Sequence, residues 1–386
     1  MRRIGAVALA VVLVPSVAFA APPAHCGIPA ALGDGWAVAA PEREGLAPGL
    51  ICAIGPRLET LAEADPNGVV IVRHGALVYE HYFTGRDQRW PELQHWREPS
   101  RTMPHNANTL HDLQSITKSI VAILVGIALD RGLLKSVDAP VLSFFPQYAD
   151  LRTPDRDRLT LRNLLSMTSG LIWTSVSTRS VERMDAAPDP YRFVLDQPLE
   201  ATPGKIWNYN GGGVEVLGAI VKKVSGQPLD RFAKQALFDP LGITDWQWAR
   251  MPNGAPAASW GLRLRPRDLA KIGQLVLNRG LWHGRRVVSA AWIREMTAAH
   301  SPSGWLSAIA DAYGYLWWRG HASLDNRNIA WVGGIGHGGQ RLYVVPSRDL
   351  VVAVTAGNYK FFGAEDPAGD TALDRALRAA MPGEGR

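Results

Sequence analysis

A serine and a lysine three residues apart stand at the start of the most apolar segment of the chain. The stretch LQSITKS, residues 113–119, leads into the run IVAILVGIAL, which ends at Asp130. Residues three apart lie on the same face of a helix, so the Lys118 amine can reach the Ser115 hydroxyl. Burial lowers the pKa of a lysine, because the ammonium loses its hydration. The pair therefore predicts a nucleophilic serine that a lysine base activates.

The same pair also has a purely structural interpretation. Ser115 could be an N-cap, with Lys118 an exposed charge on the first turn of the helix. The run behind the pair is uniformly apolar, which is not typical of a surface helix and favours catalysis. The backbone N–H of a residue at this end of a helix has no intrahelical acceptor, so that of Ser115 is available to an oxyanion.

Two later stretches supply the other groups that such chemistry requires. Tyr209 lies in TPGKIWNYNGGGVEV, residues 202–216, just before a predicted helix. A phenol near an ammonium can shuttle a proton between nucleophile and leaving group; the alternative is a core tyrosine. The stretch WVGGIGHGGQRLYVVP, residues 331–346, predicts a Gly-rich strand edge along which a substrate could lie and which could supply a second oxyanion N–H. Its alternative is a tight β-bulge that binds nothing.

The hydrophobic pattern predicts the elements that position these residues. A hairpin is expected over residues 69–83, around His74-Gly75. Helices are expected over 115–131, 160–167, 212–225, 266–279, 289–299 and 367–380. Further strands are expected only near the C-terminus, over 313–318, 328–332, 340–345 and 349–356. Strands at both ends of the chain predict an α+β fold, in which one antiparallel sheet built from both ends is flanked by helices and a mainly helical region is inserted.

The expected division places the sheet in residues 21–114 and 260–386, and the mainly helical region in residues 115–259. No internal repeat or linker separates the two regions, so they are expected to form one catalytic unit. A cleft is expected between them.

Composition excludes several other functions. The chain has 386 residues, of which 47% are hydrophobic and 20% charged, and a formal net charge of +6. Lysines and arginines are scattered singly or in pairs and form no basic stripe, so nucleic-acid binding is not expected. The histidines are not at ligand spacing and no cysteine cluster accompanies them, so neither a metal site nor a cofactor is expected.

The first 20 residues have the pattern of a signal peptide, with a basic start, an apolar core and small residues before the cut. An exported protein, periplasmic or secreted, without a stable membrane anchor after cleavage is therefore expected. An uncleaved anchor is the alternative, although the run is short for a span and Pro15 interrupts it. Export favours a disulfide between Cys26 and Cys52 over two free thiols.

Taken together, these motifs resemble the serine β-lactamase and penicillin-recognising fold. The similarity is to class C β-lactamases, family VIII carboxylesterases and 6-aminohexanoate-dimer hydrolases in particular. It extends over nearly the whole chain after the first 20 residues and includes LLSMTSGL (164–171), LRLRPRDLAKIGQLVLNRG (262–280) and GHGGQRLYVVPSRDLVVAVTAGNY (336–359). Several separate motifs in the right order make the resemblance specific.

The resemblance implies a role for each candidate residue. Ser115 would be the acyl-forming nucleophile, Lys118 its base and Tyr209 the proton shuttle to the leaving group. The oxyanion would meet the N–H groups of Ser115 and His337, the latter flanked by Gly336 and Gly338. In this register Gly334-Ile335-Gly336 takes the place of the Lys-Thr-Gly triplet of β-lactamases; a second register places Trp331-Val332-Gly333 there, as in the Trp-x-Gly of family VIII esterases.

Departures from the class C pattern concern the substrate. The chain has Tyr209-Asn210-Gly211 where class C enzymes have Tyr-x-Asn, and neither register supplies the lysine of the triplet. Arg341 could partly replace that cation. We therefore expect a hydrolase that acts on a small-molecule ester or linear amide. The alternatives are a class C-type β-lactamase or D-Ala-D-Ala peptidase, and a non-catalytic binding or sensor protein of the same fold.

Overall fold

The computed structural model describes residues 25–61, 63–88, 100–174, 179–304, 310–359 and 367–380. The predicted signal peptide, residues 1–20, lies outside the described residues. Among the helices of the described part, none combines the length and the apolar character needed to cross a membrane.

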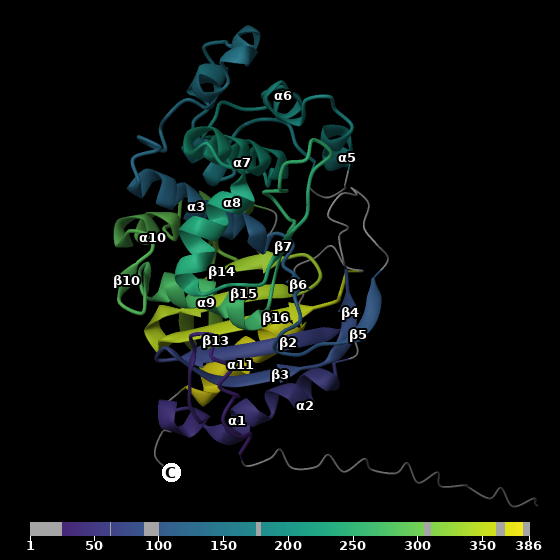
Figure 1. Ribbon diagram of the computed structural model, residues 1–386, viewed down its shortest axis with the longest axis vertical. Helices are drawn as coiled ribbons and strands as arrows, with labels where there is room; N and C mark the ends of the chain where they lie inside the picture. The colour runs from purple at the N-terminus through teal and green to yellow at the C-terminus, as the bar shows by residue number, and fades with distance from the viewer. Residues whose placement is uncertain are drawn as a thin grey trace, which may run out of the picture.

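The described residues form a central sheet in the strand order β1-β3-β2-β16-β15-β14-β13-β12-β11 (Figure 1). Its neighbouring strands are antiparallel except β1 and β3, which are parallel. Strand β2 from the start of the chain pairs with β16 from its end, which confirms the predicted α+β fold. The bounds are β1 Ala37–Val38, β2 Pro66–Arg73, β3 Ala76–Tyr82, β11 Ser301–Pro302, β12 Ala312–Tyr313, β13 Trp318–Leu324, β14 Arg327–Gly336, β15 Gln340–Val345 and β16 Leu350–Ala356.

Helices cover both faces of this sheet. On one face, α9 (Pro266–Leu277) lies so close that a Cβ on Gly273 would be 2.5 Å from Val351 and 2.9 Å from Leu342. On the other, α11 (Pro367–Ala379) packs with α1 (Pro48–Cys52) and α2 (Ile54–Glu59). Strands β2 and β16 are rich in valine and buried on both faces, as expected of the centre of a three-layer structure.

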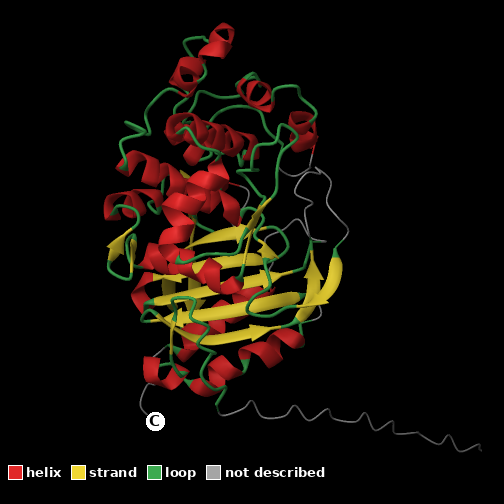
Figure 2. Ribbon diagram, viewed as in Figure 1, coloured by secondary structure: helices red, strands yellow, loops and turns green. Residues whose placement is uncertain are grey.

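A helical layer lies above the sheet in the view of Figure 2, red over yellow. Helix α3 (Ile116–Asp130) contacts both the helical layer and the sheet, because it packs on α7 (Gly211–Ser225) and also on β14 and β15. The division at residues 115 and 259 stays a prediction. The other helices are α4 Leu161–Leu165, α5 Arg179–Asp185, α6 Pro190–Leu195, α8 Leu229–Ala233 and α10 Ala290–Met296.

Smaller elements complete the described structure. A three-stranded sheet of β6, β8 and β7 lies beside the start of α3, since only three residues separate β6 from α3. The bounds are β4 Thr84–Asp87, β5 Arg101–Pro104, β6 His111–Asp112, β7 Gln247–Trp248, β8 Leu262–Leu264, β9 Leu281–Trp282 and β10 Arg285–Arg286. Short 3-10 or π turns span Pro41–Glu44, Val141–Phe144, Pro146–Leu151, Arg156–Arg158, Lys234–Phe238, Asp239–Leu241 and Pro346–Arg348.

The prediction of one strand over residues 313–318 is wrong. Strand β12 ends at Tyr313, the chain turns, and β13 begins at Trp318. Leu316 has a left-handed φ of 59°. The N–H groups of Tyr315 and Leu316 donate to the carbonyls of Met296 and Leu165, at 2.9 Å each, and not to a neighbouring strand. Tertiary hydrogen bonds therefore override the β-propensity of this aromatic segment.

The predicted disulfide between Cys26 and Cys52 is present, with 5.2 Å between the two Cα atoms. Cys52 is the last residue of α1 and is buried. The bond therefore ties the start of the described chain to the helices that cover the sheet.

We predict that the intact protein has no free thiol. Mass spectrometry after alkylation without reductant should find neither cysteine modified, and after reduction both. Because the closed loop limits the unfolded chain, a Cys26→Ser/Cys52→Ser variant should lose about 3 kcal/mol of unfolding free energy. Alkylation of both cysteines in unreduced, folded protein would contradict the prediction.

Candidate active site

Ser115 and Lys118 meet at the N-terminal end of α3. Ser115 is the residue before the helix, and Lys118 Nζ lies 3.0 Å from Ser115 Oγ. Lys118 is only 4% exposed, and its amine also donates to the carbonyl of Ser259. The Ser115 hydroxyl makes no capping hydrogen bond to the helix. The alternative interpretation, an N-cap beside a surface charge, is therefore wrong.

Burial controls the charge of Lys118. The loss of hydration lowers its pKa from 10.5 to about 7, while the carboxylate of Glu215 acts in the opposite direction. Near neutral pH a substantial fraction of the amine is thus uncharged. An uncharged amine at hydrogen-bond distance from a hydroxyl can accept its proton.

Tyr209 lies close to both Ser115 and Lys118. It precedes Asn210, the N-cap of α7, and its phenol is hydrogen-bonded with Ser115. Lys118 Nζ lies 5.0 Å from the centre of its ring. Burial raises the pKa of Tyr209 to about 12, although Ser115 acts in the opposite direction. The phenol is therefore neutral at pH 7, and it can relay a proton but is not the resting base.

Aromatic rings hold Tyr209 in place. Its ring centre lies 6.1 Å from that of Trp207, 6.3 Å from that of Tyr313 and 5.8 Å from that of Trp318. Trp318 is the first residue of β13. The turn that the sequence pattern did not predict thus brings two of these rings to the site.

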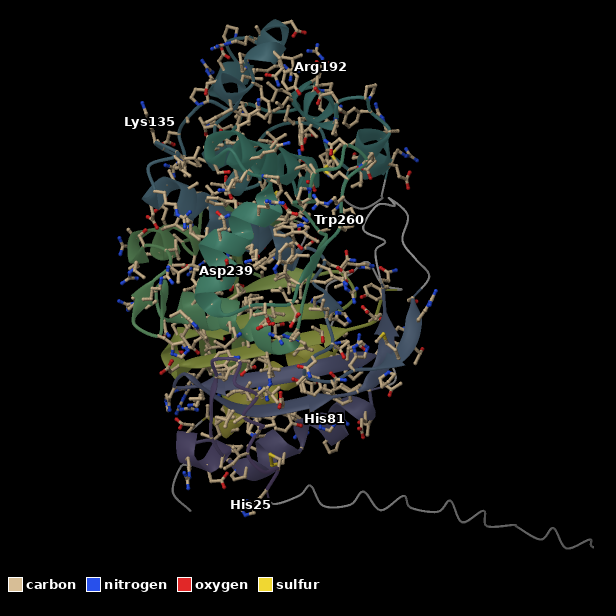
Figure 3. The ribbon with its side chains drawn as sticks, in the orientation of Figure 1. His25, His81, Lys135, Arg192, Asp239 and Trp260 are labelled. Atoms are coloured by element: carbon tan, nitrogen blue, oxygen red, sulfur yellow. A yellow bond between two sulfur atoms is a disulfide. The ribbon has the colours of Figure 1, made fainter. Side chains whose placement is uncertain are left out.

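The backbone that presents Ser115 is held in an unfavourable conformation. Gln114 has φ +48°, a region that side chains other than glycine rarely adopt. The Asp112 carboxylate stabilises it, accepting a 3.0 Å hydrogen bond from the Gln114 backbone N–H and a second from its side-chain amide. Thr117 Oγ1 donates to the carbonyl of Trp260, which lies between the helical layer and the sheet (Figure 3).

The end of strand β14 lies directly against the start of α3. A Cβ on Gly334 would be 3.0 Å from Ile116, and one on Gly336 would be 2.4 Å from the Leu113 carbonyl. Of the two registers, Gly334-Ile335-Gly336 is therefore the triplet whose outer residues face α3. The pairing of β14 with β13 stops at Gly333, the residue before the triplet, which lies opposite Trp318. Within the described residues, no strand pairs with the triplet on that side, which leaves an edge for a substrate.

His337 and Gly338 form the turn after β14. The His337 imidazole lies 3.1 Å from the Tyr359 carbonyl, so the group proposed for the oxyanion is its backbone N–H. Gly338 has φ +87°, and a Cβ there would be 2.6 Å from the Tyr359 ring. Gln340 donates to the His337 carbonyl at 3.2 Å and fixes the turn.

Arg341 does not serve as a replacement for the missing lysine. Its side chain is on the same face of β15 as Tyr343, two residues later, and Tyr343 donates to Asp370 of α11 at 3.0 Å. Leu342 faces the opposite way, towards α9 and α3. Arg341 Nη1 donates to the Gln340 carbonyl at 3.1 Å and to the Gly336 carbonyl at 3.4 Å, so backbone oxygens occupy this nitrogen. The sheet therefore separates Arg341 from Ser115.

Asn210 follows Tyr209 directly, and its side-chain oxygen is committed to the scaffold. Oδ1 accepts from the Gly213 N–H at 3.0 Å and caps α7, and the residue is buried. Within the described residues its side-chain nitrogen, Nδ2, has no hydrogen-bond partner.

Sequence reasoning did not find Glu215 and Ser259. Glu215 is 1% exposed, and its carboxylate accepts hydrogen bonds from the Ala258 and Ser259 N–H groups at 2.7 and 2.9 Å. A glutamate inside GGGVEVLGAIV, residues 211–221, was a usable signal, because an acid in an otherwise uncharged helical run needs a buried partner. Ser259 gave no signal, since it contacts Lys118 through its backbone carbonyl and Glu215 through its backbone N–H and its side chain. Within the described residues no cluster of histidine, cysteine and acidic side chains could hold a metal ion.

Comparison with known proteins finds a family match over most of the chain. The family model described as Beta-lactamase matches residues 58–374. Esterase EstB of Burkholderia gladioli is 33% identical over 189 residues, which are 46% of this chain and 45% of EstB. The 6-aminohexanoate-dimer hydrolase of Paenarthrobacter ureafaciens is 26% identical over 273 residues, 63% of this chain and 64% of that protein. These matches thus span less than two thirds of either relative.

A solved structure shows the same fold. The crystal structure of a family VIII carboxylesterase aligns with a TM-score of 0.65 at 16% identity and covers 86% of this chain and 96% of that one.

We predict an acidic limb near pH 7 in the pH profile of kcat/KM for hydrolysis of a p-nitrophenyl ester. Lys118 must be uncharged to accept the Ser115 proton, so activity should rise as the pH increases through the pKa of about 7. Lys118→Arg, which stays charged at every assay pH, should be inactive throughout. A limb at about pH 4, where carboxylates titrate, would contradict the assignment.

Proposed function

Because the chain belongs to the Beta-lactamase family and is a serine hydrolase, we propose that it cleaves an ester or a linear amide of a small molecule through an acyl-enzyme on Ser115. One observation carries the proposal: the Ser115 hydroxyl is hydrogen-bonded both to a buried lysine with a pKa of about 7 and to a neutral phenol. This arrangement provides a nucleophile, a base and a proton shuttle at one point.

In the proposed acylation, Ser115 Oγ attacks the substrate carbonyl carbon while Lys118 accepts the hydroxyl proton. The carbonyl oxygen becomes an oxyanion, which the backbone N–H groups of Ser115 and His337 stabilise. The tetrahedral intermediate then collapses, and Tyr209 relays a proton to the leaving alcohol or amine. In deacylation, water attacks the ester and gives its proton to the same base, which releases the acid and restores the Ser115 hydroxyl.

The surroundings of Ser115 support a neutral substrate. A β-lactam presents a carboxylate, and both positions of the triplet that face α3 are glycines. Arg341 lies across the sheet, and Asn210 caps α7. The name of one relative, an esterase, points in the same direction, and that of another, a 6-aminohexanoate-dimer hydrolase, supports a linear amide as the alternative bond. Carboxylesterase or 6-aminohexanoate-dimer-hydrolase-like activity is therefore proposed ahead of β-lactamase or D-Ala-D-Ala peptidase activity. A non-catalytic sensor would be acylated without turnover.

We also propose that the protein acts outside the cytoplasm, periplasmic or secreted. The disulfide between Cys26 and Cys52 supports this, because such bonds persist in oxidising compartments. N-terminal sequencing of the mature protein tests the proposed cleavage before Ala21.

We predict that Ser115→Ala abolishes both ester hydrolysis and covalent labelling by a fluorophosphonate. The variant removes the nucleophile but not the apolar residues that hold α3 in place. Ser119→Ala is the matched control: it is one turn further along the same helix and donates to the Leu316 carbonyl at 2.7 Å. It should retain the label. Labelling of Ser115→Ala at another serine would refute the assignment.

We predict that kcat/KM for a short-chain p-nitrophenyl ester exceeds that for nitrocefin by at least about 10²-fold. A charged hydrogen bond that is absent costs roughly 3 kcal/mol, which corresponds to this ratio. Arg341→Met is the control, and it should leave the ratio unchanged. Comparable turnover of nitrocefin would favour the β-lactamase alternative.

A further inference from the structure

A buried carboxylate stands behind the Ser115–Lys118 pair and takes no part in the proposed reaction. Glu215, in the second turn of α7, accepts hydrogen bonds from two consecutive backbone N–H groups, those of Ala258 and Ser259. The Ser259 carbonyl in turn accepts from the Lys118 amine. A chain of hydrogen bonds therefore runs from α7 through this loop to the base.

The loop between Ala258 and Leu262 is held from both sides. On the α7 side, a Cβ on Gly218 would be 2.8 Å from the Ala258 Cβ, so helix and loop are in close contact. On the α3 side, Thr117 Oγ1 donates to the Trp260 carbonyl at 3.1 Å and accepts from the Leu262 N–H at 3.2 Å. Glu215 provides the side-chain acceptors on the α7 side, and a buried N–H left without an acceptor is costly.

We propose that Glu215 is a positioning residue of the active site, which fixes the loop so that the Ser259 carbonyl holds the Lys118 amine beside Ser115, and which supplies the negative charge that balances the protonated amine. This inference rests on the proposed acyl-enzyme function. Glu215 touches neither Ser115 nor the edge of β14 in the described contacts, so it acts through Lys118 and the loop.

The charges around Glu215 agree with this role. Burial raises its pKa to about 7, and the Ala258 and Ser259 donors and the Lys118 charge act in the opposite direction, towards the ionised form. From α6, Tyr191 faces it as a neutral phenol, with a pKa raised to about 12 mainly by burial. Three charged side chains on elements that pack on α7 pair with other residues: Asp230 of α8 with Arg250, Arg162 of α4 with Asp138 and Glu295, and Arg192 of α6 with Asp150.

Two substitutions separate the two parts of the role. Glu215→Gln removes the charge and turns one acceptor into a donor that faces an N–H. We expect kcat to fall at least 10-fold, on the order expected when a catalytic group is displaced, with little change in KM. The acidic limb should move about one unit to lower pH, because Lys118 loses the charge that stabilises its ammonium. Glu215→Asp keeps the charge but is one methylene shorter, so it should lower kcat and leave the limb in place.

Asp230→Asn is the matched control, because it neutralises another buried carboxylate that pairs with Arg250 at 2.6 Å on α8, next to α7. It should lower the melting temperature without moving the limb. If wild-type protein is not labelled by fluorophosphonate at Ser115, the proposed function fails. Labelled wild-type protein leaves the proposed function standing, and two results would then show that the inference alone is wrong. One is an acidic limb of Glu215→Gln that does not move or that moves to higher pH. The other is a wild-type kcat for Glu215→Asp. Should Glu215→Gln not fold, the kcat of Glu215→Asp decides.

Discussion

Burial of the Lys118 ammonium is the constraint on which the rest of the site depends. In water this amine would be charged, and a charged amine accepts no proton. Packing of α3 between α7 and the sheet excludes water from the Lys118 amine. The Ser259 carbonyl and the Ser115 hydroxyl replace that water as hydrogen-bond partners. Too little burial would leave Lys118 permanently protonated. Without the carbonyl and a nearby carboxylate, the same burial would be too costly for the folded state.

This constraint explains why the two ends of the chain build one sheet. The open edge of β14 must face the first turn of α3, although some 220 residues separate them in sequence. Strand β2 pairs with β16, and β16 with β15, which fixes β14 relative to the segment that leads into α3. Gly334 and Gly336 then allow strand and helix to approach within backbone contact. A side chain at Gly336 would meet the Leu113 carbonyl at 2.4 Å and push the strand away from Ser115.

Much of the structure could be predicted from local sequence patterns, whereas the remainder depends on long-range contacts. The bounds of α3, α7, α9 and α11 could be predicted from their apolar periodicity and their glycine and proline ends, since these signals are local. The turn at Leu316 could not, because carbonyls of α4 and α10 determine it. Ser115, Lys118 and Tyr209 were recognisable from residue type and spacing. The face of the sheet on which the Arg341 side chain lies could not be predicted, because it depends on the register of β15 and not on the residue type.

The same physics connects the base to the choice of substrate. A site that lowers the pKa of a lysine to about 7 by burial holds little water, and the carboxylate beside it, Glu215, already accepts hydrogen bonds from two N–H groups. An anionic substrate entering this site would stabilise the ammonium of Lys118 and raise its pKa, which would weaken the base at the moment of attack. β-lactamases offset this with a separate cation for the substrate carboxylate. This chain places glycine at the corresponding positions and its arginine across the sheet, so a neutral acyl group leaves the protonation state of its base undisturbed.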